Sequence, residues 1–525
     1  MLYPFVMLMA PAILLAAAVA AFAHRSGRPH PLLLKATEGA ALASIAIAVG
    51  TGLLLFSHGQ ATSPLIGAFG LGFSVRVDVV STAMALLVSF VGWIVLRYSA
   101  TYLDGERRQA AFLGWMAATL VAVLLMVLAG NLLQLVAAWI ATSLCLHQLL
   151  VFYADRPQAQ RAARKKFIIA RLGDGALLGA AALLFAGYGT GDIATMLVAA
   201  REGVMPSGVT VAAGLLALAA LLKSAQFPFH GWLTEVMETP TPVSALLHAG
   251  VINGGGFLLI RFADVMLLAP GVLAVLVVLG GFTALFGGLA MLSQSAVKSS
   301  LAWSTIAQMG FMIMQCGLAL FPLALLHIVA HSLYKAHAFL SSGTAVEMVA
   351  GIRRPGPIAV PNTKAVFRAF GLALAIYLAI GIAFGLSAKS PQEIALGAIL
   401  IFGVAYLLAQ GLADAAPKML TRQTALYSVA AAVSYFALQR GADWLTAGTL
   451  PVTPAPGPLE WALLVLAVGS FGLVAVAQAM FPLWANHPAA AGLRVHLSNG
   501  LYINALFDRL LGTWSLSSSN KDATP

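Results

Sequence analysis

The segment from Lys223 to Ile260 places titratable side chains in a sequence that is otherwise apolar. Lys223 stands at the end of one apolar run, and His248 lies inside the next. A charged side chain at membrane depth is costly, so it persists where it faces a bundle interior or a wet cavity, commonly on an ion or proton path. Burial disfavours the charged form of an amine, which allows a buried lysine to release a proton near neutral pH. Lys223 is therefore the first candidate for a proton-carrying residue.

Three prolines follow Lys223 and interrupt the chain. Pro228 has no N–H to donate to the carbonyl group of Ser224, and Pro240 and Pro242 come soon after it. Interrupted membrane helices occur where neighbours or water satisfy the freed backbone, as at many ion sites. The prolines therefore predict a broken helix beside a titratable amine. The alternative is a helix that ends at the membrane surface, with a snorkelling lysine and an ordinary loop.

A second group of titratable side chains lies in the segment HIVAHSLYKAHAFL. His327, His331 and Lys335 are spaced at i, i+4 and i+8, so a helix would align them on one face over about 12 Å. This spacing suits a proton relay through intervening water. Two histidines one turn apart could also bind a metal, but no nearby carboxylate or cysteine completes such a site, and Lys335 would repel a cation. A purely structural stripe is the remaining alternative.

Other polar side chains within the apolar runs admit a structural and a functional interpretation. Arg171 and Asp174 are three residues apart, so they share a helix face and can form a pair that lowers the cost of either charge. His147 could be a hydrogen-bonded structural residue, and Lys298 could snorkel to the membrane surface. In the functional interpretation, Arg171, Asp174 and His147 tune the charge along an ion path, and Lys298 belongs to that path.

The composition sets the class of protein that contains these residues. Of 525 residues, 60% are hydrophobic and 9% are charged, and the mean hydropathy is +0.92, which indicates a polytopic membrane protein. Cys145 and Cys316 lie in apolar runs, so neither a disulfide framework nor a cysteine-based zinc site is indicated. The net charge of +11 is spread between the apolar segments, which argues against a nucleic-acid surface.

The apolar runs predict an all-α membrane helix bundle with about fifteen spans, since about twenty residues cross the hydrocarbon layer. Basic residues gather in alternate loops, and the positive-inside rule therefore places the N-terminus outside and the C-terminus in the cytoplasm. The first run lacks a basic segment before it and is expected to be a retained span. The runs centre on residues 4–23, 36–56, 77–96, 111–129, 132–153, 168–188, 209–225, 243–262, 266–291, 299–318, 321–346, 366–386, 393–412, 423–438 and 459–482.

The segment LSNGLYINALFDRLLGTW, which begins at Leu497, places apolar residues at helical spacing after the last run. We expect it to form a terminal amphipathic helix. An interfacial or partner-binding helix is the alternative.

Three segments together resemble the proton-translocating antiporter-like subunits of respiratory complex I and of the Mrp sodium/proton antiporters. The resemblance covers at least residues 70–350 and is carried by KSAQFPFHGWLTEVMETPTPVSALLHAG, QSAVKSSLAWSTIAQMGFM and HIVAHSLYKAHAFLSSG. Within that superfamily, four further segments most resemble the DabB family, the membrane subunits of two-component inorganic-carbon accumulation systems. These segments are WIATSLCLHQLLVFYADRP, KKFIIARLGDGALL, HAGVINGGGFLLIRF and LSNGLYINALFDRL.

The resemblance implies two inverted five-helix repeats, formed by spans four to eight and nine to thirteen, each with a broken helix at its centre. It divides the chain into N-terminal spans (1–110), a first repeat (111–265), a second repeat (266–415), C-terminal spans (416–482) and a cytoplasmic tail (483–525).

Motif matches also imply roles for individual residues. Lys223 matches the central lysine of the first broken helix, and His248 matches the histidine of the following helix. Asp174 matches the acidic residue of the sixth helix, and Glu238 lies in the loop before PTPVSA, where it would tune charge. The positions that match the central and connecting residues of the second half are Lys298, His327, His331 and Lys335.

Two departures from the family pattern affect these roles. Ile140 stands where the complex I members have a glutamate after the tryptophan of the fifth helix, so Lys223 lacks its expected modulator. Asp174, Arg171 or His147 could replace it. The second broken helix should also carry a lysine, and Lys389 is a weak candidate because the surrounding sequence aligns poorly.

The expected function is that of a transporter subunit, without catalysis or a cofactor of its own. It would conduct protons or sodium ions in the cell inner membrane and couple the gradient to CO2 hydration by a partner. The expected partner is a large soluble zinc-binding DabA-like subunit on the cytoplasmic side, which resembles a β-carbonic anhydrase. A cation/proton antiporter or complex I-type pumping subunit is the first alternative, and a non-conducting membrane scaffold for a soluble enzyme is the second.

Overall fold

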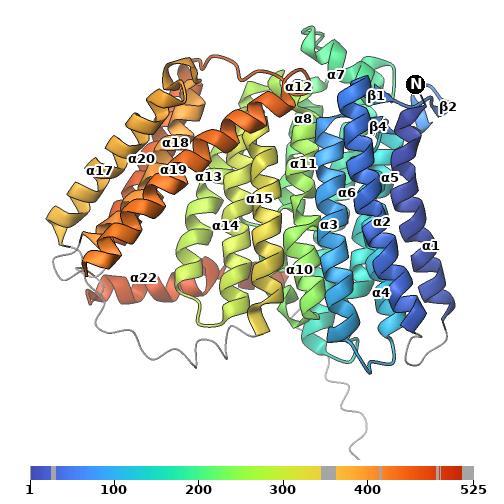
Figure 1. Ribbon diagram of the computed structural model, residues 1–525, viewed down its shortest axis with the longest axis horizontal. Helices are drawn as coiled ribbons and strands as arrows, with labels where there is room; N and C mark the ends of the chain where they lie inside the picture. Colours follow the sequence, from blue (N-terminus) through green and yellow to red (C-terminus); the bar gives the residue numbers. More distant parts are fainter. Residues whose placement is uncertain are drawn as a thin grey trace, which may run out of the picture.

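The computed structural model describes residues 2–24, 31–343, 362–412, 417–480, 484 and 486–510. Long helices run side by side between two faces of the molecule, and α22 lies across one of these faces (Figure 1). The prediction of a predominantly helical protein is confirmed. The long helices are α1 (Met9–Ala23), α2 (Pro31–His58), α3 (Val79–Tyr102), α4 (Gln109–Val127), α5 (Leu132–Leu150), α6 (Pro157–Tyr188), α8 (Val209–Lys223), α13 (Pro270–Leu292), α14 (Val297–Gly317), α15 (Phe321–Leu340), α17 (Thr363–Ala383), α18 (Pro391–Gly411), α19 (Lys418–Thr446) and α20 (Pro458–Ala479).

Eleven helical segments of the described chain are long and apolar enough to cross a membrane. Val209–Lys223 and Pro391–Tyr406 are shorter apolar helices. A multi-pass membrane protein is therefore the class to which this fold belongs. The count of fifteen spans, the two inverted repeats and the orientation of the termini stay predictions.

Short helices and strands connect or interrupt the long helices. Two antiparallel strand pairs, which the all-α prediction omitted, lie between α2 and α3, where β1 pairs with β4 and β2 with β3. The short elements are η1 (Tyr3–Leu8), β1 (Ala61–Thr62), β2 (Ile66–Ala68), β3 (Leu71–Phe73), β4 (Arg76–Val77), α7 (Ile193–Arg201), α9 (Gly231–Glu235), η2 (Val236–Glu238), α10 (Thr241–Ala249), η3 (Val251–Asn253), α11 (Gly254–Arg261), α12 (Ala263–Leu267), η4 (Leu386–Ala388), α22 (Pro488–Ser498), η5 (Gly500–Tyr502) and α23 (Ile503–Leu510).

Polar capping residues fix where several long helices begin. The Asp78 side chain accepts a hydrogen bond from the backbone N–H of Ser81, and the Ser81 hydroxyl reciprocates, which forms a capping box at the start of α3. Asn131 caps α5 in a similar way. Each cap satisfies backbone groups that the first turn of a helix leaves without a partner.

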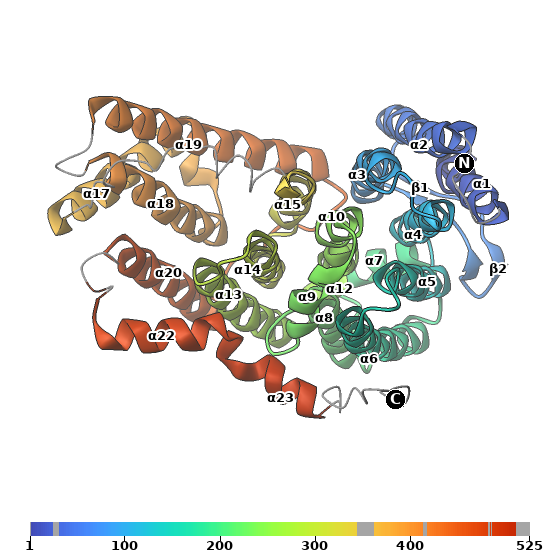
Figure 2. The ribbon, with the colours of Figure 1, turned by 90° about the horizontal axis from the view of Figure 1, so that it is seen from below.

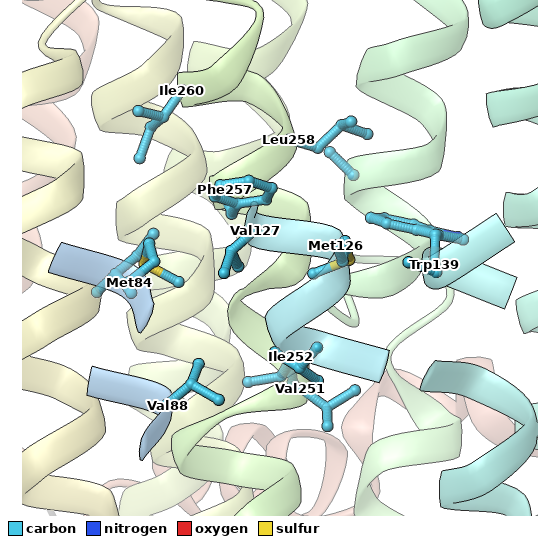
Figure 3. Close-up of a cluster of buried hydrophobic side chains, with 14 of the residues drawn as sticks. Met84, Val88, Met126, Val127, Trp139, Val251, Ile252, Phe257, Leu258 and Ile260 are labelled. Carbon is cyan, nitrogen blue, oxygen red and sulfur yellow. The ribbon is translucent and has the colours of Figure 1, made fainter. Parts of the chain in front are cut away.

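A cluster of buried apolar side chains packs the first half of the chain around the break between α10 and α11. Met84 from α3, Met126 from α4 and Trp139 from α5 lie around Ile252 and Phe257 (Figure 3). Burial of such side chains contributes about 25 cal/mol per Å² of apolar surface in a soluble reference. Within a membrane, close packing of the same side chains takes over the role of fixing the helices.

Seen along the helices, α10, α14 and α15 lie near the centre (Figure 2). The first six long helices flank this centre on one side, and α17 to α20 flank it on the other (Figure 2). The centre therefore contains the helices on which the sequence predicted the histidine and lysine row.

The last described segment of the chain differs from expectation. The terminal helix was expected from Leu497, but α22 ends at Ser498 and α23 begins at Ile503, because Leu501 adopts a left-handed conformation with φ of 53°. The rest of that expected helix, from residue 511, lies outside the described residues. In the second half, α17 runs without interruption from Thr363 to Ala383, and a turn with the short helix η4 separates it from α18, beside the weak candidate Lys389.

Candidate functional site

The chain leaves the helical conformation directly after Lys223. Helix α8 ends there, and helical structure resumes with α9 at Gly231. The carbonyl group of Ser224, which Pro228 cannot bond, accepts a hydrogen bond of 2.7 Å from the side-chain amide of Gln226. The backbone N–H of Phe227 donates to the Thr283 hydroxyl at 3.2 Å. Side chains thus satisfy the interrupted backbone, as a break inside a membrane requires.

Lys223 faces an aromatic ring and an ion pair. Its Nζ lies 4.4 Å from the centroid of the Trp139 ring on α5, a favourable cation–π distance. Asp174 and Arg171 on α6 interact with it electrostatically, and they pair with each other at 2.7 Å. Gly254 packs against Lys223, since an added Cβ would lie 3.5 Å from the lysine Cε. The structure therefore brings together three of the sequence candidates around one break.

Lys166 on α6 is a further lysine of this cluster, and it lies just before the predicted span 168–188. It is 5% exposed, and its Nζ donates to the Ser143 carbonyl and hydroxyl oxygens at 2.8 and 2.9 Å. It interacts electrostatically with Lys223 and with His147, whose ring lies 5.3 Å from that of Phe167. Helix α6 begins at Pro157, eleven residues before the predicted span 168–188, and therefore includes Lys166.

Lys165, the neighbouring residue, connects α6 to the C-terminal helix α23. It is fully buried, and its Nζ contacts Glu235 Oε1 at 2.6 Å, Asn504 Oδ1 at 2.7 Å and the Asp508 carboxylate. Gly231 leaves room for this contact, because a Cβ there would lie 1.9 Å from Asn504 Oδ1. The amphipathic helix α23 therefore docks on α6 and α9, beneath the break in α8.

A second cluster is formed by α10, α14 and α15. His248 Nδ1 lies 3.0 Å from the Thr305 hydroxyl, and the His248 ring stacks on Phe339 with centroids 4.2 Å apart. Lys335 Nζ donates to the Ser304 hydroxyl at 2.7 Å and to the Leu301 carbonyl at 3.3 Å. Both titratable side chains are thus buried against neutral polar groups.

The histidines of α15 continue this cluster toward the start of that helix. The rings of His327 and His331 have centroids 6.0 Å apart, and His327 Nδ1 lies 2.9 Å from Gln315 Oε1. His331 interacts electrostatically with His327, Lys335 and His248. Neither ring nitrogen of His331, nor Nε2 of His248, has a hydrogen-bond partner in the described part of the chain. Buried polar atoms are normally bonded, so these nitrogens mark positions suited to water-mediated transfer.

Two hydrogen bonds connect the clusters across the broken helices. The Ser224 hydroxyl donates to the Ile252 carbonyl at 3.0 Å, just after Lys223. The Asn253 side-chain amide donates to the Ser332 hydroxyl at 2.8 Å, just after His331 on α15. Asn253 was not a sequence candidate, because a neutral amide before a run of glycines carried no charge signal.

The remaining candidates lie at the edges of this arrangement. Lys298 Nζ donates to the Thr241 hydroxyl at 3.2 Å, at the first residue of α10. Pro240 precedes that helix and Pro242 occupies its first turn, where a missing N–H costs nothing, so both start a helix. The side chain of Glu238 lies outside the described part of the structure.

Lys389 lies after α17, apart from the row on α15. Its Nζ is 5.8 Å from the centroid of the Phe436 ring on α19. Within the described residues, no three His, Cys, Asp or Glu side chains are grouped as they would be to hold a metal ion.

At the face that bears the strands, buried charges are paired. Asp78 contacts Arg76 Nε at 2.7 Å and Arg261 Nη1 at 2.5 Å. Burial alone would raise the pKa of Asp78, but Arg261 and Arg76 together hold it well below its usual range. This group links the start of α3 to the end of α11.

Comparison with known proteins supports the same architecture. Residues 129–390 match the family described as NADH:quinone oxidoreductase/Mrp antiporter, TM, and residues 64–113 match NADH-Ubiquinone oxidoreductase (complex I), chain 5 N-terminus. The chain is 41% identical over 451 residues to the probable inorganic carbon transporter subunit DabB2 of Halothiobacillus neapolitanus, covering 84% of this chain and 80% of that protein.

Two further similarities are to a second relative and to a solved structure. The probable inorganic carbon transporter subunit DabB of Hydrogenovibrio crunogenus is 47% identical over 278 residues, covering 52% of this chain and 53% of that protein. The Mrp complex from Dietzia sp. DQ12-45-1b has a similar fold, with a TM-score of 0.58 and 25% identity, covering 99% of this chain and 57% of that chain.

Proposed function

The chain belongs to the family of antiporter-like membrane subunits that includes the DabB subunits, and from this premise we propose that it conducts a cation to power inorganic carbon uptake. The cation is a proton or a sodium ion. The carbon chemistry, hydration of CO2 to bicarbonate, takes place in a soluble zinc-binding DabA-like partner on the cytoplasmic side. The names of the relatives, as inorganic carbon transporter subunits, support the substrate class.

The observation that carries the conducting role is the row of buried titratable groups through the centre of the bundle. Lys223, beside the break in α8, leads through the bonded positions Ser224 and Asn253 to the cluster on α10, α14 and α15. There His248, His331 and Lys335 interact with one another. Buried ionisable side chains that face a bundle interior are typical of proton relays in pumps and transporters.

The proton moves along this row by alternating occupancy of neighbouring sites. Lys223 exchanges its proton with the part of the path next to Asp174. Lys335 receives the proton from the direction of His248. Because both lysines are buried, a second positive charge close by is disfavoured, so occupancy of one site promotes release from the next. His331 and His327 then lead the proton toward the start of α15.

Copurification and growth rescue test the two parts of this proposal together. The chain, tagged and extracted in mild detergent, should retain one large soluble protein with bound zinc. Coexpression of that pair should rescue a carbonic-anhydrase-deficient host in air, and an uncoupler should remove the rescue. Rescue that is insensitive to uncouplers would instead favour the non-conducting scaffold.

A cation/proton antiporter or complex I-type role is the second candidate, because the matched family and the Mrp complex structure belong to that class. It predicts copurification of several small membrane subunits and sodium-dependent or quinone-linked activity. The absence of zinc from a complex of that composition would favour it.

A further inference from the structure

The last described segment of the chain covers one end of the break that follows Lys223. Seen from below, α22 and α23 lie along an edge of the bundle, and α23 contacts α9 (Figure 2). Gly500, in the connection between them, lies against His230, the residue before α9, because an added Cβ would be 3.7 Å from His230 Nε2. The row of titratable groups described above does not include this histidine.

His230 is buried in an aromatic enclosure. It is 1% exposed, and the rings of Phe227, Phe286 and Trp303 have centroids 5.9, 5.5 and 5.1 Å from its own. Neither of its ring nitrogens has a hydrogen-bond partner in the described part of the chain. Buried polar atoms are normally bonded, so an unbonded imidazole at the end of a helix break is suited to a second state in which water reaches it.

A charged cluster holds α23 in the covering position. Lys165 is fully buried, contacts the carboxylates of Glu235 and Asp508, and interacts electrostatically with His230. Asn504 accepts from Lys165 at 2.7 Å and donates to Glu235 Oε1 at 2.6 Å. Desolvation of buried charges offsets much of their attraction, so such a cluster can fix a position while adding little net stability. The helix can therefore leave this contact and return to it.

The two faces of α23 are reversed relative to those of an ordinary surface helix. Asp508 is buried, whereas Leu506 and Leu510 are 57% and 80% exposed. Phe507 packs against Phe229, with ring centroids 5.7 Å apart. An amphipathic helix is usually attached through its apolar stripe, but here two leucines point away from the bundle. Movement of α23 would therefore give up little apolar contact beyond that of Phe507.

The connection between α22 and α23 has the features of a hinge. Gly500, Leu501 and Tyr502 are consecutive residues with φ of 58°, 53° and 60°. The left-handed conformation is unfavourable for leucine and tyrosine, and such strain is typical of switch regions. Before the hinge, the side-chain amide of Gln294 donates to the Ser498 carbonyl at 3.4 Å, which holds the end of α22. A change of backbone conformation at Leu501 and Tyr502 can therefore move α23 while α22 keeps its place.

We propose that α23 is a lid, which pivots about residues 500–502 and opens a path for water to His230, at the end of the break beside Lys223. The structure shows the closed state. In the open state the charged groups of Lys165, Glu235 and Asp508 become hydrated together with the imidazole. The movement does not depend on the proposed carbon coupling, whereas its use to admit protons to the Lys223 row rests on the proposed cation conduction.

A reversible disulfide tests whether the lid moves. An added Cβ at Gly231 would lie 3.2 Å from the Asn504 Cβ, close to the separation of about 3.5–4.5 Å in a disulfide, so Gly231→Cys with Asn504→Cys can lock the lid. Peptide mass spectrometry distinguishes this bond from one that involves Cys145 or Cys316. Diethyl pyrocarbonate, which modifies neutral imidazole, then reports access to His230 in membrane vesicles that contain the full chain.

The wild-type chain should react at His230 at least about tenfold faster than the oxidised variant, because access requires local opening. Reduction of the disulfide should restore the reaction. His496, which is exposed on α22, is the reference for an accessible imidazole, and His248 is the reference for a buried one. Asp508→Asn, which removes a carboxylate from Lys165, should speed the modification of His230 without altering that of His496.

Two results would overturn the movement of the lid. Modification of His230 in the wild type that is as slow as that of His248 would show that the lid stays closed, whether or not the variants fold. Equal modification in the oxidised and reduced variant would show that α23 does not control access.

Proton flux through the same vesicles separates the gating role from the proposed conduction. Gating predicts that oxidation of the variant abolishes the flux and that reduction restores it. Flux that persists after oxidation but is lost in Lys223→Ala would refute gating. Flux that persists in Lys223→Ala would refute the proposed conduction instead.

Discussion

The two clusters of titratable residues at the centre of the bundle differ in how their charge is balanced. Around Lys223, the acidic Asp174 and the basic Arg171 form an ion pair at 2.7 Å. Around Lys335, the direct partners are the neutral Ser304 hydroxyl and Leu301 carbonyl. The first cluster thus contains a negative charge that can balance its lysine. In the second cluster, the groups bonded directly to the lysine are neutral.

This difference indicates separate tasks for the two clusters. A lysine beside an ion pair can be charged or neutral at modest free-energy cost. The carboxylate of the pair favours the charged lysine, and the guanidinium favours the neutral one. Several bases buried among neutral groups cannot all be charged at once, because like charges at short range repel strongly. We infer that the Lys223 cluster accepts the cation, and that the cluster of His248, His331 and Lys335 makes its passage sequential.

Removal of either lysine is expected to have the largest effect. Lys223→Ala and Lys335→Ala should each lower carbon-dependent growth rescue by about 100-fold or more, the range that a positioned proton-transfer group contributes. The control is Lys364→Ala, since Lys364 is exposed at the start of α17. Unchanged rescue in Lys223→Ala, with the chain present in the membrane, would remove Lys223 from the path.

A substitution at Asp78 tests how much a buried ion pair stabilises the protein at a place where no proton transfer is proposed. Asp78→Ala should destabilise the protein by about 3–5 kcal/mol, because Arg261 would be left buried without its partner. The measurement is thermal unfolding in detergent, with the partly exposed pair Arg97 and Glu38 as the control site. If Asp78→Ala destabilised the protein less than Glu38→Ala does, the stabilising role of the Asp78–Arg261 pair would be contradicted.

Asp78 also makes the stability of the folded protein depend on pH. The pKa of Asp78 is depressed in the folded protein, so its stabilisation is complete above the unfolded pKa of about 4 and is lost as pH falls toward the folded value. The unfolding temperature should therefore fall between about pH 5 and pH 3. In Asp78→Asn this part of the pH dependence should be absent.

His331 distinguishes a relay from a structural stripe. His331→Ala and His331→Gln should both reduce uptake by about tenfold or more, because neither can carry a proton, while the complex still assembles. Glutamine preserves most of the volume and polarity of the histidine, so it is the matched control for packing. Full activity of His331→Gln, or loss of assembly in both variants, would favour the structural interpretation.

Asp174→Asn is expected to have the smallest effect and tests the counter-charge in the first cluster. The substitution keeps the shape of the side chain but removes the charge that interacts with Lys223. Uptake should fall by about tenfold, equivalent to about 1.4 kcal/mol, and its pH optimum should shift. Equal pH profiles for the variant and the wild type would show that Lys223 does not depend on this carboxylate.

The parts of the site that sequence could predict are those that stand out by charge or by proline. Lys223 and the row on α15 were recognisable because few ionisable residues interrupt apolar runs, and Pro228 marked the end of α8. Lys166 was missed because it lies among basic residues that read as a loop. Its burial depends on how far α6 extends, which local composition does not determine.

Other contacts depend on packing between distant segments. Asn253 and Ser332 are neutral and lie 79 positions apart, yet they bond across the centre of the bundle. Lys165 and Asn504, 339 positions apart, join the terminal helix to α6. Helix α17 ends at Ala383, where the local sequence governs its end, because Gly385 adopts a left-handed conformation with φ of 77° before η4.

Proton flux through purified protein tests the central claim most directly. The chain, together with its copurified partner, would be placed in liposomes that contain a pH-sensitive dye, and flux would be measured after addition of CO2 under an imposed pH gradient. We predict CO2-dependent proton entry in the wild type and in Lys364→Ala, and its loss in Lys223→Ala. Equal flux in Lys223→Ala and in the wild type would contradict the account.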